Sequence, residues 1–229
     1  RTNEGGTIFH LAVYNSDPQV PKLILDTFRF EDIRDEQGWT MLHHAVASGP
    51  KDTTEFLIES RHKLGINIEE RTTDGLTILH LACWYRQIEI VDLVHNGLKE
   101  IKSDIGFDTQ DDYQETPLHK ACKNETSDVA IQLLQRFPFV LVHYGKNVLH
   151  YACQYGNLKL LKFIIGNPVF GIDFNVANQG GNTPLHIACF YGHFQVVKFL
   201  LEKGIDIYKK NNNQRTAEDR ARRKGHKDI

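Results

Sequence analysis

The stretch Thr-Pro-Leu-His-Ile-Ala-Cys at residues 183–189 decides how this chain folds. Thr183 is a residue type that favours a helix N-cap, and Pro184 suits the first helical position. The apolar residues that follow recur at helical spacing, so we expect a short helix with one narrow buried face that ends at Gly192. A second helix is expected over residues 194–201. Its predicted buried face consists of Phe194, Val196, Val197, Leu200 and Leu201. Two short helices with one apolar side each cannot bury those sides alone, so this unit needs neighbours.

The same signature recurs along the whole chain. Its copies begin at Thr7, Thr40, Thr77, Thr116, Asn147, Thr183 and, in a degenerate copy, Thr216. Successive copies start 33, 37, 39, 31, 36 and 33 residues apart. A period of about 33 residues with a Thr-Pro-Leu-His-x-Ala core is typical of ankyrin repeats. The chain therefore resembles the ankyrin-repeat family over essentially its full length.

The resemblance implies an all-α fold, a solenoid of stacked helix-turn-helix units joined by short β-turn or hairpin loops. We expect one domain over residues 1–229. The approximate bounds of the repeats are 3–34, 35–71, 72–110, 111–141, 142–177, 178–210 and a truncated 211–229. The longest insertion is expected to run from Gly97 to Asp112, after the second helix of the third repeat. The chain begins inside a leading loop and stops where a second helix would start, which suggests a fragment of a larger protein.

Composition and charge narrow the function classes. No apolar run reaches the roughly 18 residues that a membrane-spanning helix needs, and the N-terminus lacks a signal-peptide pattern. We therefore expect no membrane segment in this fragment. The net charge of −2 hides an asymmetry, because residues 1–115 hold 11 Lys and Arg against 21 Asp and Glu, whereas residues 116–229 hold 16 against 8. In a rod, such a separation either orients an approaching partner or simply reflects solvated faces.

Cysteine and histidine are the residues that could carry chemistry. Cys83, Cys122, Cys153 and Cys189 each follow a repeat histidine by three residues. Equivalent positions of stacked helices lie about 8–10 Å apart, too far for a disulfide or a shared zinc ion. We interpret these thiols as packing residues in a reducing compartment, the cytoplasm and in some settings the nucleus. The family's histidines normally hydrogen-bond the threonine of their own motif and nearby backbone. No hydrolase, nucleotide-binding or metal motif is present, so we expect no enzyme activity, cofactor, metal or small-molecule substrate.

The family's partners usually contact the hairpin tips before the threonine and the two residues that end the inner helix. Transferred to this chain, those positions include both Trp and six of the eight Tyr, but only one of the thirteen Phe. Tyr and Trp combine a large contact area with a polar group and are enriched at interfaces. The predicted partner-binding residues are Tyr14, Trp39, Trp84, Tyr85, Tyr113, Tyr144, Tyr155, Phe190, Tyr191, Arg215 and Arg223. The other interpretation is that these rings only stack on neighbouring repeats and on one another.

The resemblance favours a non-catalytic scaffold or adaptor that holds a protein partner in a concave groove, similar in kind to the IκB-like or ubiquitin-pathway ankyrin proteins. The alternative is a regulatory ankyrin segment of a larger enzyme, channel or effector whose active domain lies outside this fragment. Nucleic-acid binding by the basic end is disfavoured, because the front half is acidic. Asn175 matches the family position that asparaginyl hydroxylases can modify.

Overall fold

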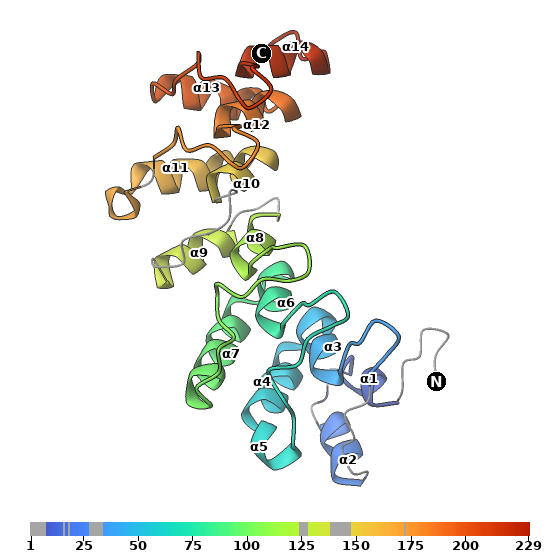
Figure 1. Cartoon of the computed structure of the whole chain (residues 1–229). Helices are drawn as coiled ribbons and strands as arrows, with labels where there is room; N and C mark the ends of the chain where they lie inside the picture. The colour runs from blue at the N-terminus through green and yellow to red at the C-terminus, as the bar shows by residue number, and fades with distance from the viewer. Residues whose placement is uncertain are drawn as a thin grey trace. The chain divides into compact units, whose positions relative to one another are not determined.

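The computed structural model describes residues 8–15, 17, 19–27, 34–123, 128–137, 148–171 and 173–229. They belong to two compact units, Arg1–Lys120 and Ala121–Ile229. Figure 1 shows that each unit is built from short helices, most of which follow one another along the chain in pairs. Apart from an isolated β-bridge between Arg71 and Thr77, the described residues contain no β-structure. Among these helices, none combines the length and the apolar character that crossing a membrane requires.

The first unit contains two rows of helices (Figure 1). Its helices are α1 (Ile8–Ala12), α2 (Gln19–Thr27), α3 (Met41–Ser48), α4 (Lys51–Glu59), α5 (Arg61–Leu64), α6 (Ile78–Trp84) and α7 (Ile88–Glu100), and α8 (Pro117–Cys122) begins at its end. The first helices of successive repeats, α1, α3 and α6, pack side by side, and so do the second helices α4 and α7. We call the first helix of each repeat its inner helix and the second its outer helix.

The second unit repeats this arrangement. Its helices are α9 (Asp128–Arg136), α10 (Val148–Gln154), α11 (Leu158–Gly166), the 3-10 turn η1 (Pro168–Phe170), α12 (Pro184–Tyr191), α13 (Phe194–Glu202) and α14 (Ala217–Lys224). The inner helices α10, α12 and α14 pack in one row, and the outer helices α9, α11 and α13 pack in another. The predicted helix-turn-helix repeats are therefore present in both units.

The inner helices α3, α6 and α12 begin at a threonine that bonds its own repeat histidine. In α6, the Thr77 side chain accepts a hydrogen bond from the backbone N–H of His80, and Nδ1 of His80 accepts one from the backbone N–H of Thr77 at 3.2 Å. Thr40 and Thr183 begin α3 and α12 in the same way, and at the start of α14 Asp219 replaces the histidine. These reciprocal bonds satisfy amide groups that a helix start otherwise leaves unpaired. The N-cap predicted for Thr183 is confirmed.

The predicted buried face of α13 is partly wrong. Val196, Val197 and Leu200 are buried, but Phe194 and Leu201 are each 48% exposed. One side of α13 packs against α11 and α12. Phe194 and Leu201 are spaced by two helical turns, so they share another side of the helix. Apolar periodicity alone overstated the width of the buried stripe.

The outer helix α7 is longer than predicted. The insertion was expected to begin at Gly97, but the helix continues through Gly97 and ends at Glu100. Two side chains from the preceding repeat lie directly over this glycine. A Cβ at Gly97 would stand 3.2 Å from Cδ1 of Ile68 and 3.4 Å from Cζ of Arg61. Here glycine permits the close approach of the Arg61 and Ile68 side chains to α7 and does not end the helix.

Candidate partner-binding surface

Each described hairpin tip is organised by one short polar side chain. Oδ1 of Asp111 accepts hydrogen bonds from the backbone N–H groups of Tyr113 and Glu115, at 3.0 and 2.8 Å. A side chain that bonds the backbone a few residues further on fixes a tight turn. We call this residue the tip anchor. The equivalent tip anchors of the other described repeats are Asp35, Thr72, Asn178 and Asn211.

Successive tips are joined through their main chains. The backbone N–H of Thr73 donates to the carbonyl oxygen of Gln37 at 3.0 Å, and that of Asp112 donates to the carbonyl oxygen of Asp74 at 3.0 Å. The same bond recurs between the last two tips of the second unit. Backbone groups thus set the spacing of the tips. The side chains of Gln37, Thr73, Asp74 and Asp112 are exposed.

Four repeat histidines, His10, His80, His150 and His186, connect their inner helix to the next tip, whereas Nε2 of His43 is buried without a hydrogen-bond partner. Nε2 of His80 lies 2.9 Å from the carbonyl oxygen of Glu115, and Nε2 of His186 lies 2.9 Å from that of Arg215. A carbonyl oxygen can only accept, so Nε2 carries the proton, and Nδ1, which accepts from a backbone N–H, is unprotonated. Burial lowers the pKa of both histidines to about 4. The expected hydrogen bonds to the motif threonine and to nearby backbone are confirmed.

Trp84 and Tyr113 flank a buried lysine. Nζ of Lys120, on α8, lies 2.6 Å from Oδ2 of Asp111 and 2.6 Å from Oε2 of Glu115. The same atom is 5.0 Å from the ring centroid of Trp84 and 5.8 Å from that of Tyr113. Burial alone would lower the pKa of Lys120, but the hydrogen bonds and charges of the two carboxylates outweigh it, and the pKa is raised. A charged ammonium attracts aromatic rings, so Lys120 helps to hold both in place.

A parallel arrangement lies at the start of the first unit. The hydroxyl of Tyr14 is 2.7 Å from Nδ1 of His44, and Nε2 of His44 is 2.8 Å from Oδ2 of the tip anchor Asp35. The ring of Trp39 packs against His44, with centroids 5.2 Å apart. His44 and Lys120 occupy the same place in the motif, between its histidine and its alanine. A residue at this place can therefore join the tip anchor of its own repeat to an aromatic ring of the preceding repeat.

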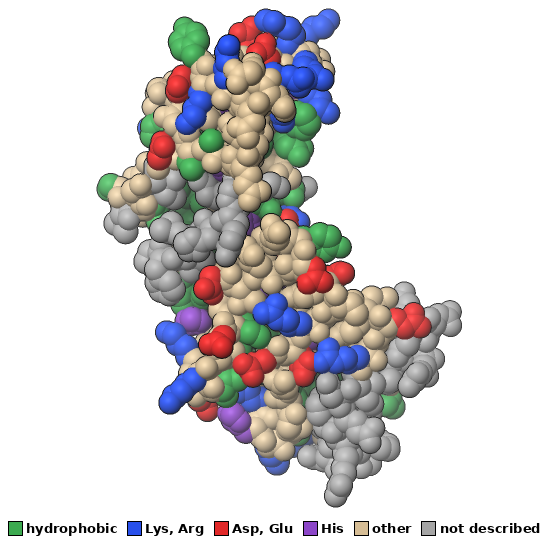
Figure 2. All heavy atoms as spheres, in the orientation of Figure 1, with side chains coloured by type: hydrophobic (Ala, Val, Ile, Leu, Met, Phe, Trp, Pro, Cys, Tyr) green, Lys and Arg blue, Asp and Glu red, His purple; other side chains and the backbone are tan. Residues whose placement is uncertain are grey.

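In the second unit, two cations contact the ring of Phe190. Cζ of Arg220 is 4.3 Å and Nζ of Lys224 is 4.4 Å from its ring centroid. Tyr191 packs edge-on against Phe190, with centroids 5.0 Å apart. Figure 2 shows Lys and Arg side chains (blue) gathered around α14. The inner-helix side of this unit therefore combines aromatic rings with positive charge.

Most of the predicted partner-binding rings reach solvent. The exposed fractions are 69% for Tyr113, 45% for Tyr191, 44% for Tyr14, 43% for Tyr85, 39% for Trp84 and 37% for Tyr155. Trp39, Phe190 and Arg215 are half-buried, Arg223 is exposed, and Tyr144 lies outside the described residues. The structure brings Trp84 and Tyr85 together, with stacked rings 6.2 Å apart, and Lys120 links Trp84 to Tyr113. Tyr14 and Trp39 form a separate group around His44.

Sequence reasoning missed His44 and Lys120, which contact the aromatic rings, and it placed Arg220 only among the residues of the basic end. All three lie at the variable place of the Thr-Pro-Leu-His-x-Ala motif. A signal was available, because a polar residue beside the apolar stripe of a short helix needs a partner. The same reasoning missed the tip anchors, whose side chains fix the turns.

Asn175 is engaged through three of its polar groups. Its Oδ1 accepts a hydrogen bond from the backbone N–H of Asp206 at 2.9 Å, and its carbonyl oxygen accepts one from Nζ of Lys209 at 2.9 Å. Its own N–H donates to Oδ1 of Asp173 at 2.8 Å. Hydroxylation of Asn175 remains a prediction.

The cysteines are buried in the packed interior. Burial raises the pKa of Cys122 and Cys153, and it raises that of Cys189 to about 12. Such thiols are poor nucleophiles and poor metal ligands, since both roles need the thiolate. Over the described ranges, no three His, Cys, Asp or Glu side chains converge as a metal site would require.

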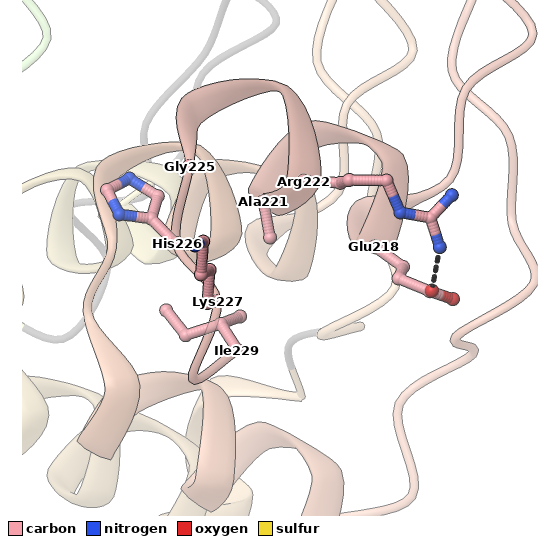
Figure 3. A pocket seen from close by; sticks show the side chains of 7 residues that line it. All are labelled: Glu218, Ala221, Arg222, Gly225, His226, Lys227 and Ile229. Carbon is pink, nitrogen blue, oxygen red and sulfur yellow. Dashed lines mark hydrogen bonds and ion pairs between the residues drawn. The ribbon is translucent and has the colours of Figure 1, made fainter.

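A cavity of about 480 Å³ opens beside α14. It is lined by Glu218, Ala221, Arg222, Gly225, His226, Lys227 and Ile229 (Figure 3). The guanidinium of Arg222 turns toward Glu218 and pairs with it at 2.5 Å, and Nε2 of His226 lies 3.2 Å from the carbonyl oxygen of Phe190. Three polar side chains that line the cavity, Glu218, Arg222 and His226, therefore already have partners within the chain.

Paired helices whose tips and histidines bond the next repeat define a helical repeat protein. The family model for ankyrin repeats in three copies matches residues 9–103, 94–178 and 149–229. The chain belongs to the ankyrin-repeat family. The resemblance inferred from the sequence and the predicted all-α repeat fold are both confirmed.

The curated relatives are much longer than the part that this chain matches. The chain is 28% identical to the mouse B-cell lymphoma 3 protein homolog over 184 residues, which cover 78% of this chain and 38% of that protein. It is 28% identical over 131 residues to a transient receptor potential cation channel subfamily A member 1 homolog of Caenorhabditis elegans. The match covers 57% of this chain and 10% of that protein. It is 30% identical over 133 residues to human neurogenic locus notch homolog protein 1, covering 57% and 5%.

Two solved ankyrin-repeat domains share the fold. The ankyrin repeat domain of Bcl-3, a member of the IκB protein family, has a TM-score of 0.71 at 22% identity and covers 94% of this chain and 93% of that domain. The human ASB11 ankyrin repeat domain has a TM-score of 0.75 at 19% identity and covers 94% and 92%. Ankyrin repeats are generally protein-protein interaction modules without catalytic activity.

Proposed function

We propose that this chain is a scaffold that binds a protein partner through the inner-helix sides and hairpin tips of its repeats. The observation that carries the proposal is the group formed by Trp84, Tyr85 and Tyr113. These large rings stay 39%, 43% and 69% exposed, although Lys120 holds two of them in place. Rigid, amphipathic rings at a surface are the side chains that most often dominate protein interfaces.

The exposure of these rings argues against the interpretation that they only stack on one another. Trp84 and Tyr85 do stack, and Tyr14 bonds His44 of the next repeat. Stacking that served packing alone would bury the rings, as Tyr151 is buried at 4% exposure. The exposed rings keep enough surface to contact a partner, so the contacts among them pre-organise a binding surface.

A regulatory segment of a larger protein is the second candidate function. It is supported by the small share of its relatives that the chain matches, 10% of the channel homolog and 5% of the notch homolog. In this case the same surface would bind either another domain of the same protein or a separate regulator.

A display library of random dodecapeptides, selected on the intact chain, tests the proposal. Selected peptides are then titrated against the wild-type chain and the variants Trp84→Ala and Tyr85→Ala by calorimetry. Truncating an anchor at a well-packed site costs about 2 kcal/mol or more, so we expect affinity to fall roughly thirtyfold.

Phe194→Ala is the matched control, because Phe194 is also an exposed ring, but it lies on the outer helix α13. We expect this variant to bind the peptides as the wild type does. Unchanged affinity in both the Trp84 and the Tyr85 variants would remove these residues as anchors.

A further inference from the structure

Three repeats place a basic side chain directly before the alanine of the motif, and two of them pair it with a carboxylate of the same repeat. In the second repeat, His44 bonds the carboxylate of its tip anchor Asp35 at 2.8 Å. In the fourth repeat, Lys120 pairs with its tip anchor Asp111 at 2.6 Å. Each of these residues also contacts an aromatic ring of the preceding repeat.

The last repeat keeps the cation and the ring but lacks the carboxylate. Arg220 lies 4.3 Å from the centroid of Phe190, as Lys120 lies over Trp84. The tip anchor of this repeat, however, is the neutral residue Asn211. Its Oδ1 accepts the N–H groups of residues 213 and 215, and its Nδ2 donates to Asn182 at 2.8 Å. Asn211 therefore has no charge to offer Arg220.

No other carboxylate of the described residues pairs with Arg220. Glu218 is taken by Arg222 (Figure 3), and Asp219 caps the helix by bonding Thr216. Nε of Arg220 is buried without a hydrogen-bond partner. Burial lowers the pKa of the guanidinium because the charge loses water, and the neighbouring Tyr191 offsets this only in part. A partly desolvated cation in this condition gains strongly from an incoming anion.

The surroundings of Arg220 favour an acidic ligand with an apolar side. Arg223 and Lys224 are exposed on the same helix, and Lys224 contacts the ring of Phe190. Tyr191, which is 45% exposed, borders this ring. Two cations thus contact this aromatic pair, and Arg223 lies on the same helix. Among the described residues, no carboxylate is paired to any of the three.

We propose that the face formed by Phe190, Tyr191 and Arg220 binds an acidic segment of a protein partner, whose Asp or Glu carboxylate pairs with Arg220. The partner thereby supplies the group that Asp35 and Asp111 supply within their own repeats. This inference rests on the proposed function, because the ligand is a polypeptide. Two cations on the ring of Phe190, with Tyr191 beside it, suit one or two carboxylates next to an apolar side chain. A nucleic acid would instead need a longer line of basic groups to follow its phosphates.

The dodecapeptides selected on the intact chain test this proposal by calorimetry with two variants. Arg220→Gln removes the cation. Asn211→Asp restores the carboxylate that the second and fourth repeats carry, so it should neutralise Arg220 internally. Peptides that depend on Arg220 should be rich in Asp and Glu. Both variants should lower the affinity for these peptides about tenfold to a hundredfold, the range for a lost charge-assisted hydrogen bond. Arg222→Gln is the control, since Arg222 already pairs with Glu218, and it should leave affinity unchanged.

The outcomes separate this inference from the proposed function. Peptides that depend on Trp84 but not on Arg220 would overturn the acidic site and leave the binding scaffold standing. Arg220-dependent peptides without an excess of Asp and Glu would overturn the chemistry of the ligand. A labelled DNA duplex is titrated in parallel, and binding that Arg220→Gln abolishes would reassign the site to nucleic acid. Circular dichroism of each variant confirms that it is folded.

Discussion

Arg86 and Gly192 occupy the same place in their repeats and share a left-handed backbone, with φ of 65° and 79°. Both lie at the junction between an inner and an outer helix. Gly156 and Gly225 fill the equivalent place in two other repeats, with φ of 69° and 80°. Gly49, at the same place in the second repeat, instead has φ of −76°. The third repeat therefore keeps the left-handed junction of the other three although its residue is not glycine.

Replacing Arg86 with glycine should stabilise the first unit. An L-residue in the left-handed region costs about 1–2 kcal/mol, which is partly offset by the larger entropy that glycine loses on folding. We expect Arg86→Gly to raise the free energy of unfolding by about 0.5–1 kcal/mol, measured by urea denaturation. The control Gly192→Ala should destabilise the chain, because its Cβ would lie 2.6 Å from Cε1 of His226. A lower stability of Arg86→Gly would contradict the strain argument.

The repeat histidines should make stability depend on pH. Burial lowers the pKa of His43 to about 3 and that of His80 and His186 to about 4, against about 6.5 in the unfolded chain. Above pH 6.5 these histidines are neutral in both states. Below it the unfolded chain binds more protons, so the free energy of unfolding falls as the pH drops from about 6.5 toward 4. We expect a loss of about 2 kcal/mol for each histidine at about pH 5.

Urea denaturation at about pH 7.5 and pH 5 measures this loss. His80→Asn should lower stability at the higher pH, since Nε2 of His80 no longer reaches Glu115, but should reduce the difference between the two pH values. Equal stability of the wild-type chain at both pH values would show that these histidines do not remain neutral in the folded state.

The stability of the fold should depend on Lys120 only while the carboxylates of Asp111 and Glu115 are present. Lys120→Ile leaves Asp111 and Glu115 without their buried counter-charge, and breaking such a pair costs about 3–5 kcal/mol. The double variant Asp111→Asn with Lys120→Ile copies the sixth repeat, which carries Asn178 and Ile187 at these places. We expect it to recover part of the lost stability in thermal denaturation, because Glu115 still lacks its counter-charge. A double variant as unstable as the single one would show that packing, and not charge, governs this position.

The regular part of the fold could be predicted from the sequence because its determinants are local. Thr183 and His186 bond each other within one helical turn, so their motif fixes where α12 begins. The pairing of Asp111 with Lys120 could not be predicted in the same way. It depends on how the hairpin tip folds back over the inner helix, and the Asn211 repeat shows that the cation can occur without the carboxylate.

Which apolar side chains are exposed was the other feature that the sequence did not predict. The periodicity of α13 placed Phe194 and Leu201 with the buried residues, although the neighbouring helices cover only one side of it. Gly97 was expected to end a helix, but the approach of Ile68 and Arg61 makes glycine useful inside it. Most of the predicted partner-binding rings are exposed, because both the hairpin tips and the ends of the inner helices occur at fixed offsets from the motif, and their binding role stays a prediction.

The hydrogen bonds between hairpin tips separate the stability of this chain from its recognition properties. Gln37 and Asp74 contribute carbonyl oxygens to the stacking of the tips, and any other residue would contribute the same atom. We therefore expect substitutions at exposed tip positions such as Gln37 and Asp74, outside the tip anchors, to change the surface of the chain at a small cost to folding. Such a surface can acquire new ligands one tip at a time, which makes it readily adaptable in evolution and a practical place to engineer a new specificity.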